Sequence, residues 1–356
     1  MTKPILPPAT LGIVGGGQLG QMMALAAKPM GYRVVVLDPQ INAPAAQIAD
    51  QQLVANYDDE SALRNLADVI TYEFENVSQE ALANAVPAKQ LPQGTQLLHI
   101  TANRLREKTF IADLGLPVAP FAAVDNVVAL DASCHKVSLP AILKTVEGGY
   151  DGHGQWDIPN QEALANLLAH WDVPVNTPMI LENQITFDRE LSVMVARDIS
   201  GDIRTWPVTV NEHQNHILHV SAAPASLSDK IADEIAHIAK TLANALNLVG
   251  VLGIEMFVAG DQVYVNELAP RPHNSGHFTI EATNVSQFEG HVRSVLGLPI
   301  PEIKQWAPAM MLNLLGDDIN RARRELIDHP EWQMGHITVT GLREMKALRA
   351  WGHQKG

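Results

Sequence analysis

The chain has 356 residues, of which 46% are hydrophobic and 18% charged, and its formal net charge is −14. These values are typical of a globular protein of two or three domains. Basic residues form no run beyond the short cluster Arg321–Arg324, so the sequence does not favour a nucleic-acid-binding surface. Cys134 is the only cysteine, which excludes an intrachain disulfide and a thiolate metal site. Neither a signal-peptide pattern nor an apolar run of membrane-spanning length is present, which favours a cytoplasmic protein without membrane contacts.

A glycine-rich turn follows the first predicted strand. Thr10–Val14 is a short apolar strand, Gly15–Gly20 follows it as GGGQLG, and Gln21–Lys28 is predicted to be helical. The second strand, Arg33–Leu37, ends at Asp38, at about the spacing of a ribose-binding acid. The pattern predicts a Rossmann-like α/β unit. It leaves the ligand open between NAD and another phosphate, because a helix N-terminus receives any phosphate group.

Acidic and basic side chains mark the end of this first unit. The strand Asp68–Tyr72 leads into Glu73–Asn76, at the strand end where open α/β sheets bind ligands, although a turn role is equally open. A helix is predicted over Thr101–Leu114, with Arg104 and Lys108 one turn apart. We place the end of the first domain at residue 106.

The next segment combines a strand lysine with a glycine-rich loop. Lys144 lies near the end of the predicted strand Ala141–Thr145, and EGGYDGHG occupies residues 147–154. Four glycines in eight residues permit a loop that folds over a ligand and offers N–H donors to phosphate, or simply a flexible hairpin tip. The loop lacks the Gly-Lys-Ser/Thr ending of a Walker A sequence.

The chain then mixes strands and helices in the manner of an α+β fold. Asn211–His213 are expected in a loop between two of these strands. The predicted helices and strands are Glu162–Trp171, Met179–Leu181, Glu190–Ala196, Arg204–Val210, His216–Val220 and Asp229–Asn247.

A β-hairpin with two carboxylates is predicted next. Gly253–Val258 and Gln262–Leu268 are apolar and β-branched, with a turn signal between them. A turn centred near Asp261 places Glu255 opposite Glu267, with Cβ atoms about 5 Å apart. Two such charges repel, so we expect a divalent cation or a shared proton between them, unless both are simply solvated.

A polar loop follows the hairpin and favours the ligand-binding alternative. It contains an unusual density of side chains that bind ligands, and two prolines stiffen it. These side chains are Asn266, Arg271, His273, Asn274, Ser275 and His277. A helix over Thr279–Leu296 should follow, and then a small third domain at 301–356 with strands at Met310–Leu315 and Gly335–Thr340 and a charged helix between them.

In this order the motifs resemble the ATP-grasp superfamily, and more closely the N5-carboxyaminoimidazole ribonucleotide synthetases of purine biosynthesis. The matching segments cover most of the chain: GGGQLGQM (15–22), TYEFENV (71–77), KTVEGGYDGHGQ (144–155), FDRELSVMVAR (187–197) and NELAPRPHNSGH (266–277). The last is the most specific. The resemblance implies α/β and α+β architecture: a pre-ATP-grasp domain (1–106), an ATP-grasp domain (107–300) and a small C-terminal domain (301–356), usually in a homodimer.

The resemblance also implies a reaction. An enzyme of this family joins bicarbonate to the exocyclic amine of 5-aminoimidazole ribonucleotide, through carboxyphosphate, while ATP becomes ADP and phosphate. ATP and Mg²⁺ are the implied cofactors.

The implied site residues fall into four groups. The ATP site comprises Arg104, Lys144, Gly149, Tyr150, Asp151, Gly152, His153, Gly154, Gln155, Glu182, Asn183, Gln184, Ile185, Glu190, His213, Asn266 and Glu267. Magnesium is expected on Glu255 and Glu267. The ribonucleotide site comprises Gly17, Gln18, Leu19, Glu73, Tyr150, Arg271, His273 and Asn274. The catalytic candidates are Asp151, Arg271 and His273, with Asp151 orienting or deprotonating the amine.

One segment departs from the family pattern. Relatives commonly carry a lysine and an Arg-Lys pair just before the C-terminal glycine-histidine, but here Pro330–Gln333 precede Met334–His336. Those cations normally help to hold the ribonucleotide phosphate. Arg323, Arg324 or Arg343 could substitute, substrate affinity could be low, or the stretch could be absent from this chain.

Three other functions stay open at this stage. They are another ATP-grasp ligase with a different acid and amine, an NAD-dependent oxidoreductase built on Gly15–Gly20 and Asp38, and a non-catalytic nucleotide-binding module. The oxidoreductase leaves Lys144 and the carboxylate pair Glu255 and Glu267 without a role.

Overall fold

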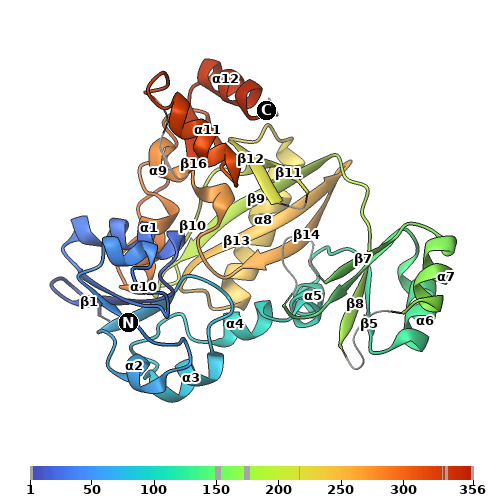
Figure 1. Ribbon diagram of the computed structural model, residues 1–356, viewed down its shortest axis with the longest axis horizontal. Coiled ribbons are helices and arrows are strands. Elements are labelled where there is room, and N and C mark those ends of the chain that lie inside the picture. The colour runs from blue at the N-terminus through green and yellow to red at the C-terminus, as the bar shows by residue number, and fades with distance from the viewer. Residues whose placement is uncertain are drawn as a thin grey trace.

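The computed structural model describes residues 3–148, 154–171, 177–215, 217–330, 332 and 336–353 (Figure 1). Its described strands form three sheets: a four-stranded parallel sheet, a four-stranded antiparallel sheet and an eight-stranded antiparallel sheet. The predicted combination of α/β and α+β architecture is confirmed.

The parallel sheet belongs to the N-terminal unit, drawn in blue in Figure 1. Its order is β3-β2-β1-β4, so β1 lies between the two strands with which it pairs in parallel. The strands are β1 (Thr10–Val14), β2 (Arg33–Leu37), β3 (Gln51–Leu53) and β4 (Val69–Tyr72), and the helices are α1 (Gln18–Ala27), η1 (Lys28–Met30), η2 (Pro44–Gln47), α2 (Glu60–Arg64) and α3 (Gln79–Ala85).

The small antiparallel sheet and its two helices form a separate lobe on the right of Figure 1. The order β5-β8-β6-β7 places the strand of Lys144 beside the strand that carries Glu182. The elements are β5 (Phe121–Val124), α6 (Val127–Val137), β6 (Ala141–Thr145), β7 (Gln155–Ile158), α7 (Gln161–Ala169) and β8 (Met179–Asn183).

The large sheet runs through the centre of the molecule in the order β14-β13-β9-β11-β12-β15-β16, with β10 paired to β9 (Figure 1). Its strands are β9 (Arg189–Arg197), β10 (Ile203–Thr205), β11 (Thr209–Gln214), β12 (Ile217–Ala223), β13 (Gly250–Ala259), β14 (Gln262–Ala269), β15 (Ala309–Asn313) and β16 (His336–Thr340). The remaining helices are α4 (Gln96–Thr101), α5 (Arg104–Asp113), α8 (Asp229–Ala245), η3 (Asn274–Gly276), α9 (Thr279–Ala282), α10 (Gln287–Val295), α11 (Asp317–Glu325) and α12 (Leu342–Gly352).

The apolar face of α8 builds the largest core. Ile231, Ile235, Ile238 and Leu242 follow the helical period of three to four residues and are buried against β9, β13 and β14. Ser228 caps the helix by accepting the N–H of Ile231. This packing holds the carboxylate hairpin β13–β14 rigidly against β9.

One predicted strand and the predicted loop after it are wrong in detail. Arg204–Val210 is not one strand: β10 pairs with β9 alone, and β11 begins after Pro207, which has no N–H for a ladder. Residues 211–213 therefore lie within β11, not in a loop.

Two predicted helices, Thr101–Leu114 and Thr279–Leu296, also differ from those observed. The first is α5 with a later start, because the side chain of Asn103 accepts the N–H of Arg106 and caps the helix there, while Thr101 is the last residue of α4. The second becomes α9 and α10, with Ser286 capping the latter.

The C-terminal strands continue the large sheet. β15 pairs with β12 and β16 pairs with β15, while α11 lies between them in sequence as predicted. The boundaries at residues 106 and 300 stay predictions.

His291 connects the first sheet to the large one and gives a test of this packing. Its fully buried ring accepts the Val251 N–H at Nδ1, 3.2 Å away, and lies 2.7 Å from the Thr71 hydroxyl through Nε2. Burial lowers the pKa of His291 to about 3. Below about pH 6.5 His291 is therefore protonated in the unfolded chain but stays neutral in the folded chain.

We expect the free energy of unfolding to fall by about 2 kcal/mol between pH 7 and pH 5 through His291. Urea denaturation at several pH values measures it. The His291→Gln variant should show a shallower pH slope, whereas His237→Gln, at an exposed position of α8, should keep the wild-type slope. Equal slopes in all three proteins would contradict the assignment.

Candidate active site

A β-bulge aligns the two carboxylates of the hairpin. From the tip, Ala259 pairs with Gln262 and Met256 with Val265, which would bring Glu255 opposite Asn266. The register shifts by one residue beyond Met256, so that Glu255 pairs with Glu267 instead. The predicted pairing is confirmed, but its cause is different: the turn is the two-residue Gly260–Asp261, and the bulge at Asn266 supplies the extra residue.

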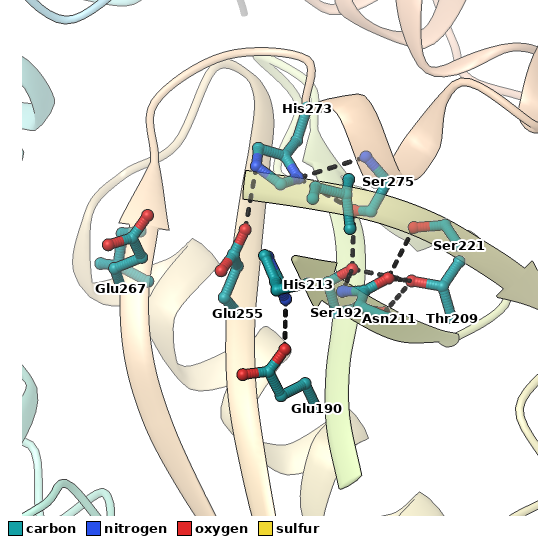
Figure 2. Close-up of polar contacts among 12 residues, drawn as sticks. Glu190, Ser192, Thr209, Asn211, His213, Ser221, Glu255, Glu267, His273 and Ser275 are labelled. Atoms are coloured by element: carbon teal, nitrogen blue, oxygen red, sulfur yellow. Dashed lines mark hydrogen bonds and ion pairs between the residues drawn. The ribbon is translucent and has the colours of Figure 1, made fainter. Parts of the chain in front are cut away.

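Each carboxylate of this pair has a basic partner. His273 Nε2 lies 2.9 Å from Glu255 Oε1 (Figure 2). The Arg104 guanidinium lies 3.1 Å from Glu267 Oε2. Burial would raise the pKa of Glu267, but nearby positive charge, that of Arg104 foremost, outweighs burial and lowers that pKa. The Glu267 carboxylate is thereby kept ionised, in spite of the neighbouring Glu255.

The donor set of this pair suits magnesium. Within the described part of the chain no three His, Cys, Asp or Glu side chains gather as a metal cage. Two carboxylates on neighbouring strands fit Mg²⁺, which takes its other ligands from water and from substrate phosphates.

Three cations converge on Glu182 from two elements. Lys144 Nζ lies 2.9 Å from Glu182 Oε2, Lys108 Nζ lies 3.8 Å from the same oxygen, and Arg104 lies 3.8 Å from Oε1. Burial would raise the pKa of Glu182, but these cations lower it to about 2. Lys108 was not among the predicted site residues, although its position one turn after Arg104 was a signal in the sequence.

The helix α5 thus connects the two antiparallel sheets. Arg104 contacts Glu182 on β8 and Glu267 on β14, while the fully buried Lys108 also donates to the Val265 carbonyl at 3.3 Å. Glu107, on the same helix, accepts the Leu268 N–H, and burial raises its pKa. The result is a compact charged junction between the lobes.

The residues expected around the adenine and ribose lie in two places, on β9 and β11 of the large sheet and at the end of β8. The His213 side chain on β11 hydrogen-bonds to Glu190 on β9. Burial would lower the pKa of His213, but this bond and the surrounding carboxylate charges together outweigh burial and raise it. At the end of β8, the Asn183 amide donates to the Pro140 carbonyl at 3.2 Å, so this side chain holds the fold, while Gln184 is exposed.

Glu73 occupies part of the glycine turn. Its carboxylate accepts the N–H groups of Gly17 and Gly20 at the start of α1, and burial raises its pKa. While Glu73 stays in place, a phosphate at the predicted position can therefore accept the N–H groups of Gln18 and Leu19 but not that of Gly17. An added Cβ on Gly17 would lie 2.7 Å from Glu73 Oε1, so a side chain at this position would displace the Glu73 carboxylate.

The loop after β14 brings the first unit to the carboxylate hairpin. Arg271 Nε donates to Glu75 Oε2 at 3.0 Å, while two residues later His273 contacts Glu255. Asn274 begins η3, where the His273 side chain accepts the Ser275 N–H. The loop thus brings the predicted ribonucleotide residues Arg271, His273 and Asn274 next to the predicted magnesium ligand Glu255 on β13.

Most of the glycine-rich loop lies outside the described residues, including Gly149, Tyr150, Asp151, Gly152 and His153. Its end is fixed beside the strand lysine. Gln155 pairs with Lys144 across β6 and β7, and the Gly154 carbonyl accepts the Thr145 N–H. Gly154 has φ +70 and an added Cβ would lie 2.7 Å from Thr145 Oγ1.

Removing the Glu182 charge tests the charged junction. Glu182→Gln leaves Lys108 buried without its carboxylate, and we expect a loss of about 3–5 kcal/mol in the free energy of unfolding. Glu60→Gln, which removes an exposed ion pair with Arg64, should cost at most about 1 kcal/mol. Urea denaturation of both variants makes the comparison, and similar losses would refute the proposed role of Glu182.

Two family models match the chain. Residues 8–102 match the ribonucleotide synthetase preATP-grasp domain, and residues 109–288 match the ATP-grasp domain. Residues 103–108 lie between the two matches and include Arg104 and Lys108 of α5.

Curated relatives and solved structures match over nearly the whole chain. N5-carboxyaminoimidazole ribonucleotide synthase of Bacillus subtilis (strain 168) is 44% identical, over 99% of this chain and 93% of its own length. The enzyme of that name from Staphylococcus aureus (strain COL) is 40% identical, over 97% and 91%. An ADP complex of an N5-carboxyaminoimidazole ribonucleotide synthetase superposes with TM-score 0.93 at 41% identity, covering 100% of both chains.

A solved structure with lower sequence identity contains the ribonucleotide as well as ADP. The Aspergillus clavatus synthase, in complex with ADP and 5-aminoimidazole ribonucleotide, superposes with TM-score 0.84 at 28% identity, over 95% of this chain and 96% of that one. With its sequence, fold and site geometry together, this chain belongs to the N5-carboxyaminoimidazole ribonucleotide synthase family.

Proposed function

We propose that this chain catalyses the ATP-dependent carboxylation of 5-aminoimidazole ribonucleotide to N5-carboxyaminoimidazole ribonucleotide, a step of purine biosynthesis that forms a C–N bond. One observation carries the proposal: the loop after β14 contacts the acidic end of β4 through Arg271 and the hairpin carboxylate through His273. It therefore lies between the expected ribonucleotide side and the expected ATP side.

Bicarbonate is the proposed second substrate, because it needs activation that ATP can supply. A bicarbonate oxygen attacks the γ-phosphorus, and carboxyphosphate and ADP result. Carboxyphosphate then breaks its C–O bond to give CO₂ and phosphate, the amine nitrogen bonds to carbon, and its proton passes to a base. Water must be excluded, because carboxyphosphate hydrolyses easily.

Arg104 and Lys144 are the proposed phosphate-binding cations. Both now contact carboxylates, Arg104 that of Glu267 and Lys144 that of Glu182, at 3.1 and 2.9 Å. Phosphoryl transfer requires cations around the transferred group. Lys108 remains behind them, buried, and keeps Glu182 ionised.

Magnesium is the proposed metal, with Glu255 and Glu267 as its protein ligands. When bound it supplies positive charge to the phosphate oxygens. Arg104 and His273 each engage one oxygen of these carboxylates, and so orient the pair.

The ribonucleotide is proposed to lie on the N-terminal unit, near Gly17, Gln18 and Leu19. Glu73, Arg271 and Asn274 are proposed to surround its ring, with His273 beside the reacting groups. Asp151, outside the described residues, stays the proposed base. A homodimer is proposed from the family resemblance. No helix within the described ranges is long and apolar enough to cross a bilayer.

The alternative oxidoreductase has lost its main support. Asp38, its expected ribose acid, accepts the Gly16 N–H and the Tyr57 hydroxyl, both at 2.7 Å, and is buried. The carboxylate is therefore engaged in holding the turn.

Three basic residues could replace the segment that relatives carry before the C-terminal glycine-histidine. They are Arg323 and Arg324 on α11 and Arg343 on α12, and all three are exposed.

ADP release tests the proposed function. With ATP, Mg²⁺ and bicarbonate present, 5-aminoimidazole ribonucleotide should stimulate ADP release strongly. Protection from thermal unfolding by ATP without such stimulation would indicate an ATP-grasp protein with another acceptor. Protection by NAD instead would support the oxidoreductase.

Lys144→Ala should abolish ribonucleotide-stimulated ADP release while the fold persists, because the lysine neutralises phosphate charge. Circular dichroism checks the fold of the variant. Lys230→Ala removes an exposed ion pair with Asp261 far from the proposed chemistry and serves as the control. Normal turnover in Lys144→Ala would show that the assigned phosphate site is wrong.

A further inference from the structure

A cluster of small polar side chains lies beneath His273, in the interior of the large sheet. Ser192 on β9, Asn211 on β11, Ser221 on β12 and Ser275 on η3 are all buried, with exposed fractions from 0 to 6% (Figure 2). Burying hydroxyl and amide groups is unfavourable unless every one of them is hydrogen-bonded. Nothing in the roles assigned above uses these four residues.

The cluster is a continuous chain of hydrogen bonds. Ser221 Oγ donates to Asn211 Oδ1 at 2.6 Å, and Asn211 Nδ2 donates to Ser192 Oγ at 2.9 Å. Ser192 Oγ then donates to Ser275 Oγ at 2.6 Å. Thr209 lies beside the chain, with its hydroxyl 2.7 Å from Ser192 Oγ.

The chain ends on the imidazole of His273. Ser275 Oγ lies 2.9 Å from His273 Nδ1, and the proton of this hydroxyl is free to point there because Ser192 donates to the same oxygen. The Ser275 backbone N–H also points to Nδ1, at 3.4 Å. A backbone N–H can only donate, so Nδ1 is an acceptor and the ring proton lies on Nε2.

We propose that Ser275, Ser192, Asn211 and Ser221 are positioning residues that hold His273 in its Nε2–H tautomer, so that it donates a hydrogen bond to Glu255. Every donor along the chain then points toward that carboxylate. His273 Nε2 lies 2.9 Å from Glu255 Oε1 and holds that oxygen. The other carboxylate oxygen, Oε2, is then left to serve as the proposed magnesium ligand. Partners of this kind orient ligands in many metal sites.

This inference rests on the proposed function for its consequence, but not for its geometry. The tautomer can be read by NMR in the free protein, without ATP, metal or ribonucleotide. Selective ¹⁵N-histidine labelling reports which ring nitrogen carries the proton, and a His273→Gln variant assigns the signals. The wild type should show a proton on Nε2 and an unprotonated Nδ1.

Removing either of two serines from this series of hydrogen bonds should have the same effect on the His273 tautomer and on kcat. Ser275→Ala and Ser192→Ala should each mix the His273 tautomers and lower kcat for ribonucleotide-stimulated ADP release about 10–100-fold. Their double variant should lose little more than either single one, because the residues act as one unit. The KM for the ribonucleotide should change much less than kcat.

Ser294→Ala is the matched control. Ser294 is a fully buried serine that donates to the Arg197 carbonyl and accepts the Gly250 N–H, outside this cluster. It should lose stability like the test variants, and keep both the His273 signals and kcat.

Two results would overturn the inference. One is a wild-type His273 with its proton on Nδ1, a measurement that needs no variant to fold. The other is an unchanged tautomer in Ser275→Ala and Ser192→Ala. A protein that passes the NMR test but shows no stimulated ADP release would refute the proposed function instead, and leave the hydrogen-bonded chain in place.

Discussion

Two like charges held opposite each other on one hairpin are the constraint around which this molecule is built. Glu255 and Glu267 are paired by a bulge, not by the turn that joins their strands. Repulsion at such a distance is unfavourable, and each carboxylate is stabilised from a different direction. Arg104 reaches one from α5, and His273 reaches the other from the loop after β14.

These two compensating residues link the carboxylate pair to the rest of the fold. Through Arg104 the hairpin is connected to Glu182, and so to Lys108, Lys144 and the small antiparallel sheet. Through the loop of His273 it is connected to the Arg271–Glu75 ion pair and the N-terminal unit. Three sheets thereby meet at charges that balance one another before any substrate arrives. ATP and metal would exchange partners within this set, without bringing charge into an apolar interior.

The sequence predicted those parts that local patterns determine. Alternating apolar residues with a Gly-Asp turn predicted the hairpin, and the strand–glycine–helix order predicted the first unit. The bulge at Asn266 was not predictable, because it is a backbone irregularity stabilised by contacts with distant segments, such as the bond from the Val265 N–H to the Pro117 carbonyl. Asn103 and Ser286, which start new helices, are common residue types whose capping role depends on geometry.

The site could be predicted only as far as residue chemistry signals it. Lysine, carboxylate and histidine side chains were predicted as site residues from their chemistry, and many of them meet at the junction of the sheets. Ser192 and Ser275 did not, because serines are frequent, and only the strand order β13-β9-β11-β12 brings them under His273. The capture of the Gly17 and Gly20 N–H groups by Glu73 was equally hidden, since 53 residues separate Gly20 from Glu73.

The most direct test of this account is the fate of a bicarbonate oxygen. In ¹⁸O-labelled bicarbonate with ATP, Mg²⁺ and 5-aminoimidazole ribonucleotide, mass spectrometry of the released phosphate follows the label, in a time shorter than oxygen exchange with water. If these residues serve the phosphorylation of bicarbonate, each turnover places one labelled oxygen in phosphate, because the C–O bond of carboxyphosphate breaks. Unlabelled phosphate, released at the same rate as ADP, would show that water is the acceptor and would contradict the account.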